Sequence, residues 1–188
     1  MTLSIRALSV AAMLTVASIG GAIAQDNPQV GGAAMFADKN IVENAVNSAD
    51  HTTLVAAVQA AGLVETLSGE GPFTVLAPVN AAFDALPAGT VDTLLMPENK
   101  DTLSTILACH VIPAKALSTD IVSMVEADGG EHVVDTVGGC QLTLEATDGK
   151  VTVTDENGTV ANVTIADVIQ SNGVIHVIDA VLTPKSAM

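Results

Sequence analysis

The chain has 188 residues, which is enough for one domain with a hydrophobic core and too few to favour two ordinary domains. Its formal net charge of −15 argues against binding to nucleic acid or to anionic lipid headgroups, because both are negatively charged. Tyr and Trp are absent and Phe occurs only at positions 36, 73 and 83, so the chain lacks an aromatic platform for stacking bases or sugar rings.

Residues 1–24 have the features of a secretory signal peptide. A single positive charge at Arg6 precedes an apolar run from Ala7 to Ile19, and the small residues Ala22 and Ala24 fit a cleavage site. A membrane anchor is the alternative, but serines and glycines interrupt the run, which is shorter than the ~20 residues of a spanning helix. We therefore expect a secreted or periplasmic protein, with no membrane insertion after cleavage.

Helices are predicted to follow a short lead-in. The lead-in is residues 25–39, of which 25–34 are expected to be loosely held, because they are polar and rich in glycine. Apolar residues then recur at helical spacing over 41–49 and again over 54–61. Asp50 is the expected N-cap of the second helix, and Gly62 is expected to end it.

The next predicted element is a short buried strand over Phe73–Ala77, which Pro78 ends. Asn80 is expected to cap a short helix that buries Phe83, because its side-chain oxygen can accept a hydrogen bond from an unpaired amide in the first turn. Residues 91–96 form a further short helical segment.

A longer helix is predicted from Pro97 to about Val111, since proline is well suited to a first helical turn. Its apolar face has residues at the spacing i, i+3, i+4 and i+7: Leu103, Ile106, Leu107 and His110. The imidazole is therefore expected to be buried, with Cys109 to one side.

From Glu131 onward the chain is rich in Val, Ile and Thr. The predicted strands are 133–137, 141–146, 150–154, 159–165 and 174–182. Asp148-Gly149 and Asn157-Gly158 are expected to be two-residue hairpin turns. Helices first and antiparallel hairpins later predict an α+β fold.

Cys109 and Cys140 are the only cysteines. Two cysteines in an oxidising compartment usually pair, so we expect a disulfide, with two free thiols as the alternative. The bridge would close a loop of roughly thirty residues, which corresponds to about 3.5 kcal/mol of stabilisation by the chain-entropy estimate.

The residues that could carry catalysis lack the necessary patterns. There is no G-x-S-x-G segment, and Cys109 and His110 are neighbours on one helix, so they point in different directions and cannot form a catalytic pair. Residues 153–158 resemble part of a calcium loop, but valine and threonine occupy its first and twelfth ligand positions. We expect no enzyme activity and no cofactor or bound metal.

The four histidines also lack the spacing of a zinc site. His176 shares a strand face with Val174 and Ile178, which favours a buried, hydrogen-bonded imidazole over a ligand. The alternative is a metal-dependent binder or enzyme with a site near His132 and the carboxylates at positions 126, 128 and 131. A purely structural envelope component is a third possibility.

Three segments together resemble the motifs of the fasciclin domain family: Thr74–Phe83, His110–Lys115 and Asn172–Pro184. The similarity runs over 40–184 and leaves 185–188 as a tail. It departs from the usual family pattern at Val79, where threonine is common, and at Cys109, where an aromatic residue is common. The resemblance implies helices packed against a wedge of two mainly antiparallel β-sheets. It also implies a monomeric adhesion or interaction module with a protein, cell-surface or matrix partner.

The resemblance assigns roles to particular residues. Architectural roles are expected for Asn80, Phe83, His110, Pro113 and His176. Asp167-Val168-Ile169 match the position of the family's proposed adhesive element, as an exposed carboxylate beside apolar side chains. The alternative is that Val168 and Ile169 belong to the core. Asp120-Ile121 is a second, weaker candidate of the same type.

Overall fold

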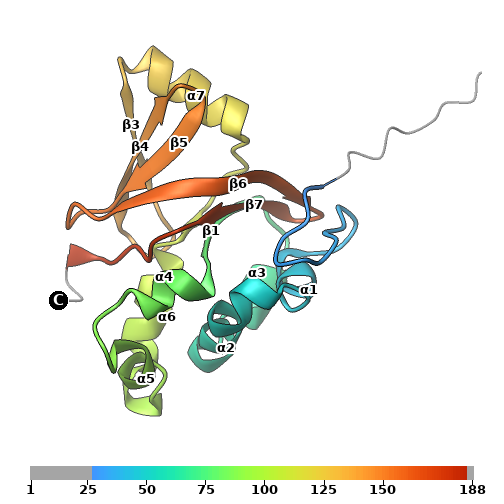
Figure 1. Ribbon diagram of the computed structural model, residues 1–188, viewed down its shortest axis with the longest axis vertical. Coiled ribbons are helices and arrows are strands. Elements are labelled where there is room, and N and C mark those ends of the chain that lie inside the picture. Colours follow the sequence, from blue (N-terminus) through green and yellow to red (C-terminus); the bar gives the residue numbers. More distant parts are fainter. Residues whose placement is uncertain (1–26, 186–188) are drawn as a thin grey trace, which may run out of the picture.

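A bent seven-stranded sheet organises the computed structural model, which describes residues 27–185 (Figure 1). Its strand order is β2-β1-β7-β6-β5-β4-β3. The strands are β1 (Phe73–Pro78), β2 (Val111–Ile112), β3 (Glu131–Asp135), β4 (Gln141–Thr147), β5 (Lys150–Thr154), β6 (Val160–Gln170) and β7 (Gly173–Ile178). β1 and β7 are parallel, and the other pairs among the described strands are antiparallel.

The bend lies in β6, which belongs to both halves of the sheet. Its pairing with β7 shifts register between Val163 and Ile165, and again between Ile165 and Val168. Such irregularities bend a strand and increase its twist. The two half-sheets, β2-β1-β7-β6 and β6-β5-β4-β3, therefore form a wedge (Figure 1). The predicted α+β fold is confirmed.

Helices cover the two half-sheets separately. The helical segments are α1 (Ile41–Ala45), η1 (Ala49–His51), α2 (Thr52–Ala61), α3 (Val64–Ser68), α4 (Asn80–Asp84), α5 (Thr90–Leu94), η2 (Pro97–Asn99), α6 (Lys100–Ala108) and α7 (Ser118–Ala127). α1 to α6 lie on the side of β1 and β7, whereas α7 packs on β3, β4 and β5 (Figure 1). Among residues 27–185, no helix combines the length and apolar character needed to cross a bilayer.

Two hydrophobic cores result from this arrangement. The helical core lies between α1 to α6 and the β1-β7 pair, and includes Leu54, Val75, Phe83, Leu107 and Ile175. The wedge core lies between the half-sheets and under α7, and includes Leu76, Ile121, Leu142, Val153 and Leu182. β1 contributes to both cores because alternate residues of a strand point to opposite faces.

The predicted elements differ from the structure mainly around residues 108–127. The helix expected to reach Val111 ends at Ala108, and Val111–Ile112 form β2 instead. α7 has no counterpart in the sequence prediction, because only Ile121 and Val125 in it are buried. Two buried residues at i and i+4 give too narrow an apolar stripe to stand out by periodicity.

The prediction of a loosely held segment over 25–34 is wrong for its described part, 27–34. The side chain of Asn27 exchanges two hydrogen bonds with the backbone of Ile169, at 2.6 and 2.9 Å. Val30 and Met35 are buried in the helical core. A side-chain amide that pairs with both backbone groups of one residue substitutes for a strand partner, which polar composition alone does not reveal. The predicted signal peptide, 1–24, and residues 186–188 of the tail lie outside the described residues.

The two predicted hairpin turns have different outcomes. Asp148-Gly149 connects β4 and β5 with positive φ at both residues, so this prediction is confirmed. The prediction for Asn157-Gly158 is wrong, since the connection from β5 to β6 is a loop closed by Asp155 and Thr159. The buried carboxylate of Asp155 organises this loop by accepting from the amides of Asn157 and Thr159, at 2.9 and 2.8 Å.

The predicted disulfide between Cys109 and Cys140 is present, with the two Cα atoms 5.4 Å apart. It joins the end of α6 to the start of β4, and therefore links the helical core to the wedge. Gly138 lies against the same helix end, where an added Cβ would be 2.7 Å from the Cys109 nitrogen. The loop that carries Cys140 thus requires glycine to approach α6.

Replacing both cysteines, as Cys109→Ala/Cys140→Ala, is expected to lower the free energy of unfolding by about 3.5 kcal/mol, because the unfolded chain regains the freedom of the closed loop. Urea unfolding of the variant and of the oxidised chain measures the difference. Two thiols that react with an alkylating agent in the unreduced protein would contradict the bridge.

Candidate functional site

Three histidines are buried in the interior: His51 in η1, His110 just after α6 and His176 in β7. The predicted burial of His110 and His176 is confirmed. His51 was not predicted, although it precedes Leu54 and Val58 at the same i, i+3 and i+7 spacing that indicates burial of His110.

His110 is held as one neutral tautomer. The amide of Leu182 donates to its Nε2 at 3.0 Å, so the ring proton lies on Nδ1, which donates to the carbonyl of Ile106 at 2.8 Å. Burial lowers the pKa of His110 to about 4, because the charged imidazolium would lose its hydration. The ring thus ties the last turn of α6 to the C-terminal segment.

His176 and His51 are arranged on the same principle. Nδ1 of His176 accepts from the Asp167 amide at 3.3 Å, and its Nε2 donates to the carbonyl of Ala116 at 2.9 Å. His51 accepts at Nδ1 from the Ser48 hydroxyl at 2.8 Å, and its Nε2 faces the carbonyl of Ala77 at 3.4 Å. Burial lowers the pKa of both histidines.

Ser118, Asp167 and His176 come together, but not as a hydrolytic triad. The Asp167 carboxylate accepts from the hydroxyl and the amide of Ser118, the latter at 2.7 Å, rather than from the imidazole. His176 faces only the backbone amide of Asp167 and is itself buried. In a catalytic triad the carboxylate is hydrogen-bonded to the histidine, and the histidine is hydrogen-bonded to the serine hydroxyl. This cluster lacks both hydrogen bonds, so it cannot activate Ser118.

These contacts revise the expected adhesive element at Asp167-Val168-Ile169. The alternative holds for Val168, which has 0% exposure and belongs to the helical core. Asp167 is half-buried and adopts a left-handed backbone with φ of 59°, which aims its carboxylate at the start of α7. It serves as an N-terminal cap for a helix 49 residues away in the sequence. A role of this element in partner binding stays a prediction.

The weaker candidate, Asp120-Ile121, also has internal contacts. Ile121 is buried in the wedge core, and the Asp120 carboxylate accepts from the Leu117 amide at 3.0 Å. Both residues therefore position α7.

Asn80 caps a different helix from the one predicted. It is the first residue of α4 and makes no cap bond there. Its Oδ1 accepts from the Thr53 amide at 3.0 Å in the first turn of α2, and its Nδ2 donates to the Ala49 carbonyl at 2.9 Å. Asp50, the expected N-cap of α2, makes no such bond, because η1 precedes that helix and His51 occupies the cap position.

Phe83 and Pro113 complete the predicted architectural set. Phe83 packs in the helical core, as expected for the short helix α4. Pro113 follows β2 at the surface, where the chain turns towards Ala116.

The alternative metal or catalytic site brings together only two of its groups. His132 and Asp128 form a hydrogen-bonded pair at 2.6 Å between Nδ1 and Oδ2. Within residues 27–185, no group of three or more His, Cys, Asp or Glu side chains could hold a metal ion.

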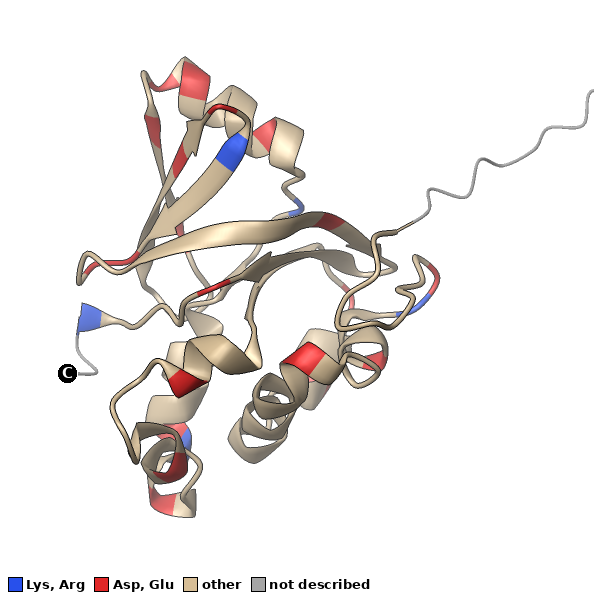
Figure 2. Ribbon diagram, viewed as in Figure 1, with Lys and Arg blue, Asp and Glu red and all other residues tan. Residues whose placement is uncertain are grey.

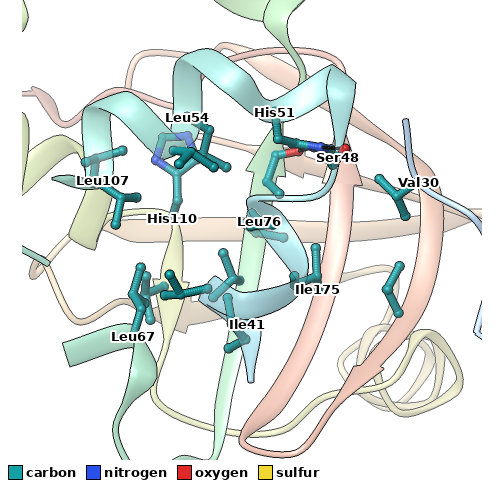
Figure 3. Close-up of a pocket in the computed structure, with 18 of the residues that line it drawn as sticks. Val30, Ile41, Ser48, His51, Leu54, Leu67, Leu76, Leu107, His110 and Ile175 are labelled. Carbon is teal, nitrogen blue, oxygen red and sulfur yellow. Dashed lines mark hydrogen bonds between the residues drawn. The ribbon is translucent and has the colours of Figure 1, made fainter. Parts of the chain in front are cut away.

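A cavity of about 80 Å³ lies in the helical core between α1, α2, α3 and the β1-β7 pair (Figure 3). Its walls are mainly aliphatic and include Val30, Ile41, Leu54, Leu67 and Ile175. An unfilled apolar cavity of this size costs about 2 kcal/mol of stability. No sequence pattern predicts it, since it arises from packing between segments that lie far apart in the chain.

Figure 3 shows the imidazoles of His51 and His110 among these apolar side chains. Both rings already use their nitrogen atoms in the contacts described above. The cavity therefore offers apolar surface and few free hydrogen-bonding groups.

The sequence of residues 49–184 matches the family model of the Fasciclin domain. The chain belongs to the fasciclin domain family. Protein sll1483 of Synechocystis sp. is 48% identical over 172 residues, which cover 92% of this chain and 88% of that protein. Immunogenic protein MPB70 of Mycobacterium bovis is 33% identical over 151 residues, which cover 76% of this chain and 67% of that protein.

Larger relatives contain the domain as a small part. Transforming growth factor-beta-induced protein ig-h3 of Sus scrofa is 40% identical over 133 residues, which cover 71% of this chain and 17% of that protein. Among solved structures, the FAS1 domain pair of the insect cell adhesion molecule Fasciclin I matches with a TM-score of 0.70 at 18% identity, covering 79% of this chain and 52% of that chain. This last likeness supports the fold.

The buried histidines predict that this fasciclin domain loses stability in mild acid. Near pH 5 the unfolded chain protonates His110 at its ordinary pKa of 6.5, whereas the folded chain, with a pKa of about 4, does not. The unfolded state then binds more protons, so stability falls as the pH is lowered through 6.5. His110 alone should contribute about 2 kcal/mol of this loss between pH 7 and 5.

Urea unfolding of the wild type and of His110→Gln across this pH range tests the assignment. The variant should be less stable at pH 7 and should lose less stability on acidification. His132→Gln is the matched control, because it removes an imidazole outside both cores that pairs with Asp128 and does not bridge two buried backbone groups. If the free energy of unfolding of His110→Gln depends on pH as that of the wild type does, this imidazole is not the group responsible.

Asp167→Ala is expected to lower the free energy of unfolding by roughly 1–2 kcal/mol, because the first turn of α7 loses its acceptor. Asp167→Asn should be milder, since asparagine keeps an acceptor oxygen and tolerates the left-handed backbone. Thermal unfolding of the three proteins gives the comparison. If Asp167→Ala is as stable as the wild type, the carboxylate is not a structural cap and is free for a partner.

Proposed function

We propose that this protein is an exported adhesion module without catalytic activity, and that it holds a protein partner on the outer face of the β3-β4-β5 half-sheet. The observation that carries the proposal is an uncovered row of apolar and hydroxyl side chains across four strands. Family membership supports the general role, since one solved relative is a cell adhesion molecule.

The row follows from strand register. Val133 of β3 pairs with Thr143 of β4, Thr143 with Thr154 of β5, and Thr154 with Val160 of β6. Leu142, Leu144, Val151 and Val153 alternate with them and are buried in the wedge core under α7. The row must therefore point away from α7, because successive residues of a strand face opposite sides. We call this surface the outer face.

The outer face presents apolar groups that a partner could bury. Val133 is 55% exposed and Val160 is 51% exposed, and they flank the half-buried Thr143 and Thr154. No described helix covers this side of the half-sheet (Figure 1). Protein interfaces commonly have such an apolar centre with a polar rim.

Charge indicates the kind of partner. In the neighbouring row, Glu131 of β3 pairs with Glu145 of β4, and Glu145 pairs with Thr152 of β5. Carboxylates therefore border the apolar row on β3 and β4. Figure 2 shows Asp and Glu on these strands, and the whole chain has a net charge of −15. A neutral or basic protein surface, on a cell or in a matrix, would complement this face.

The buried histidines argue against catalysis. Each of the three has both ring nitrogens directed at groups of the protein, and their pKa values are lowered by burial. A general acid or base must reach a substrate proton and titrate near the working pH. These imidazoles hold segments together instead, which suits a rigid module that presents a surface.

The double variant Val133→Glu/Val160→Glu tests the outer face. It should weaken attachment to cells or matrix at least tenfold, because it places charges in the apolar centre of the interface. The matched control is Val46→Glu/Val137→Glu, which changes two valines of similar exposure, 52% and 49%, outside this row.

Attachment is measured with purified, labelled protein, and thermal unfolding verifies that both variants fold. Equal attachment by the two double variants would remove the outer face from consideration. Loss in both would indicate nonspecific charge repulsion rather than a defined site. Turnover of a substrate by the wild type, abolished in His110→Gln or His176→Gln, would overturn the non-enzymatic role.

A further inference from the structure

The cavity in the helical core has properties that distinguish it from an ordinary packing defect. It is lined mainly by α1, α2, α3, β1 and β7, with further residues from η1, α6, β2 and β6, and the described lead-in contributes Val30 and Met35. Native interiors are usually packed with few voids larger than a water molecule. A cavity of about 80 Å³ therefore requires an explanation in a small domain.

The lining excludes a charged occupant. No Asp, Glu, Lys or Arg is among the residues that line the cavity, and its polar members are Ser48, His51, Gln59 and His110. Ser48 and the two imidazoles already bond to one another or to the backbone. An ionised headgroup inside would lose its hydration without gaining a partner.

The size of the cavity favours a chain over a ring. An engineered cavity of about 150 Å³ is large enough to bind benzene, and the present one is about half as large. A few methylene groups in a row would fill it, since a linear alkyl chain is narrower than a ring. The remainder of such a molecule must leave through an opening.

The lining residues nearest the surface lie on α1, α2 and α3. Val42, Ala45, Val55 and Val64 line the cavity and are only half-buried, and Gln59 lines it from an exposed position. The route outward is therefore apolar, with one amide at its rim. This arrangement fits a molecule with an alkyl tail and a small uncharged polar end.

We infer that this cavity binds the alkyl chain of an uncharged amphiphile, such as a long-chain alcohol, with the polar end near Gln59. This ligand site lies on the helical side of the molecule and is separate from the adhesion surface on the outer face. Adhesion and ligand binding can therefore fail independently. The ligand fills space that the folded protein leaves empty, so its binding also stabilises the fold.

Methyl NMR titration of the full chain with 1-decanol tests the site directly. Methyl signals of Leu67 and Ile175, which line the cavity, should shift and saturate at one equivalent of decanol. Signals of Leu142 and Leu144, in the wedge core, should stay in place. Decanoate at pH 7 should bind at least tenfold more weakly, because no Lys or Arg lines the cavity and the chain has a net charge of −15. 1-Adamantanol should not bind because of its width.

Two phenylalanine variants separate the site from general surface adsorption. Ala45→Phe fills the opening at the end of α1 and should weaken decanol binding at least tenfold. Ala56→Phe, at an exposed position of α2 outside the lining, should bind as the wild type does. If Ala45→Phe does not fold, the methyl titration of the wild type decides alone.

Several results would overturn the inference. Absence of saturable decanol binding, or shifts of equal size in both cores, would show that the cavity is not a ligand site. Equal affinity for decanol and decanoate would contradict the uncharged class of ligand. Unchanged binding in a folded Ala45→Phe would place the ligand elsewhere.

Discussion

Buried backbone groups that leave a helix or strand need hydrogen-bond partners, and in this domain side chains from distant segments supply them. His110 joins the last turn of α6 to Leu182, and His176 joins β7 to Ala116. Asn80 and Asp167 cap helices α2 and α7 from elsewhere in the chain. No buried side-chain nitrogen or oxygen in the described residues lacks a partner. Because an unpaired buried polar group is costly, these few residues fix how the two cores meet.

This constraint explains why histidine is used without its usual chemistry. A neutral imidazole offers one donor and one acceptor that point in diverging directions from a flat ring, so it can bridge two backbone groups that do not face each other. Aliphatic side chains would fill the same volume but leave those groups unpaired. The consequence is a domain whose interior is sensitive to acid and whose reactive groups are turned inward, while the outer face carries threonine, valine and carboxylates.

The fold class and the burial of two histidines could be predicted from sequence, because they depend on local spacing and on family motifs. The disulfide could be predicted because the chain has only two cysteines. The contacts of Asp167-Val168-Ile169 could not be predicted in this way. Asp167 and Val168 alternate in a strand, but the left-handed backbone at Asp167 redirects the carboxylate to Ser118. Asn80 was likewise assigned to the helix that it begins, because sequence shows which residues can cap a helix but not which helix end lies beside them.

The cavity and the imidazole network are connected through His110, which lines the cavity and bonds to Leu182 in the wedge core. A polar ligand that hydrogen-bonds to this ring would have to displace Ile106 or Leu182, and would leave a buried backbone group without a partner. An alkyl chain forms no hydrogen bonds, so it displaces neither partner of the ring. The same bonds that hold the two cores together therefore limit what the interior of the cavity can accept, and the preference for an alkyl chain there follows from the architecture.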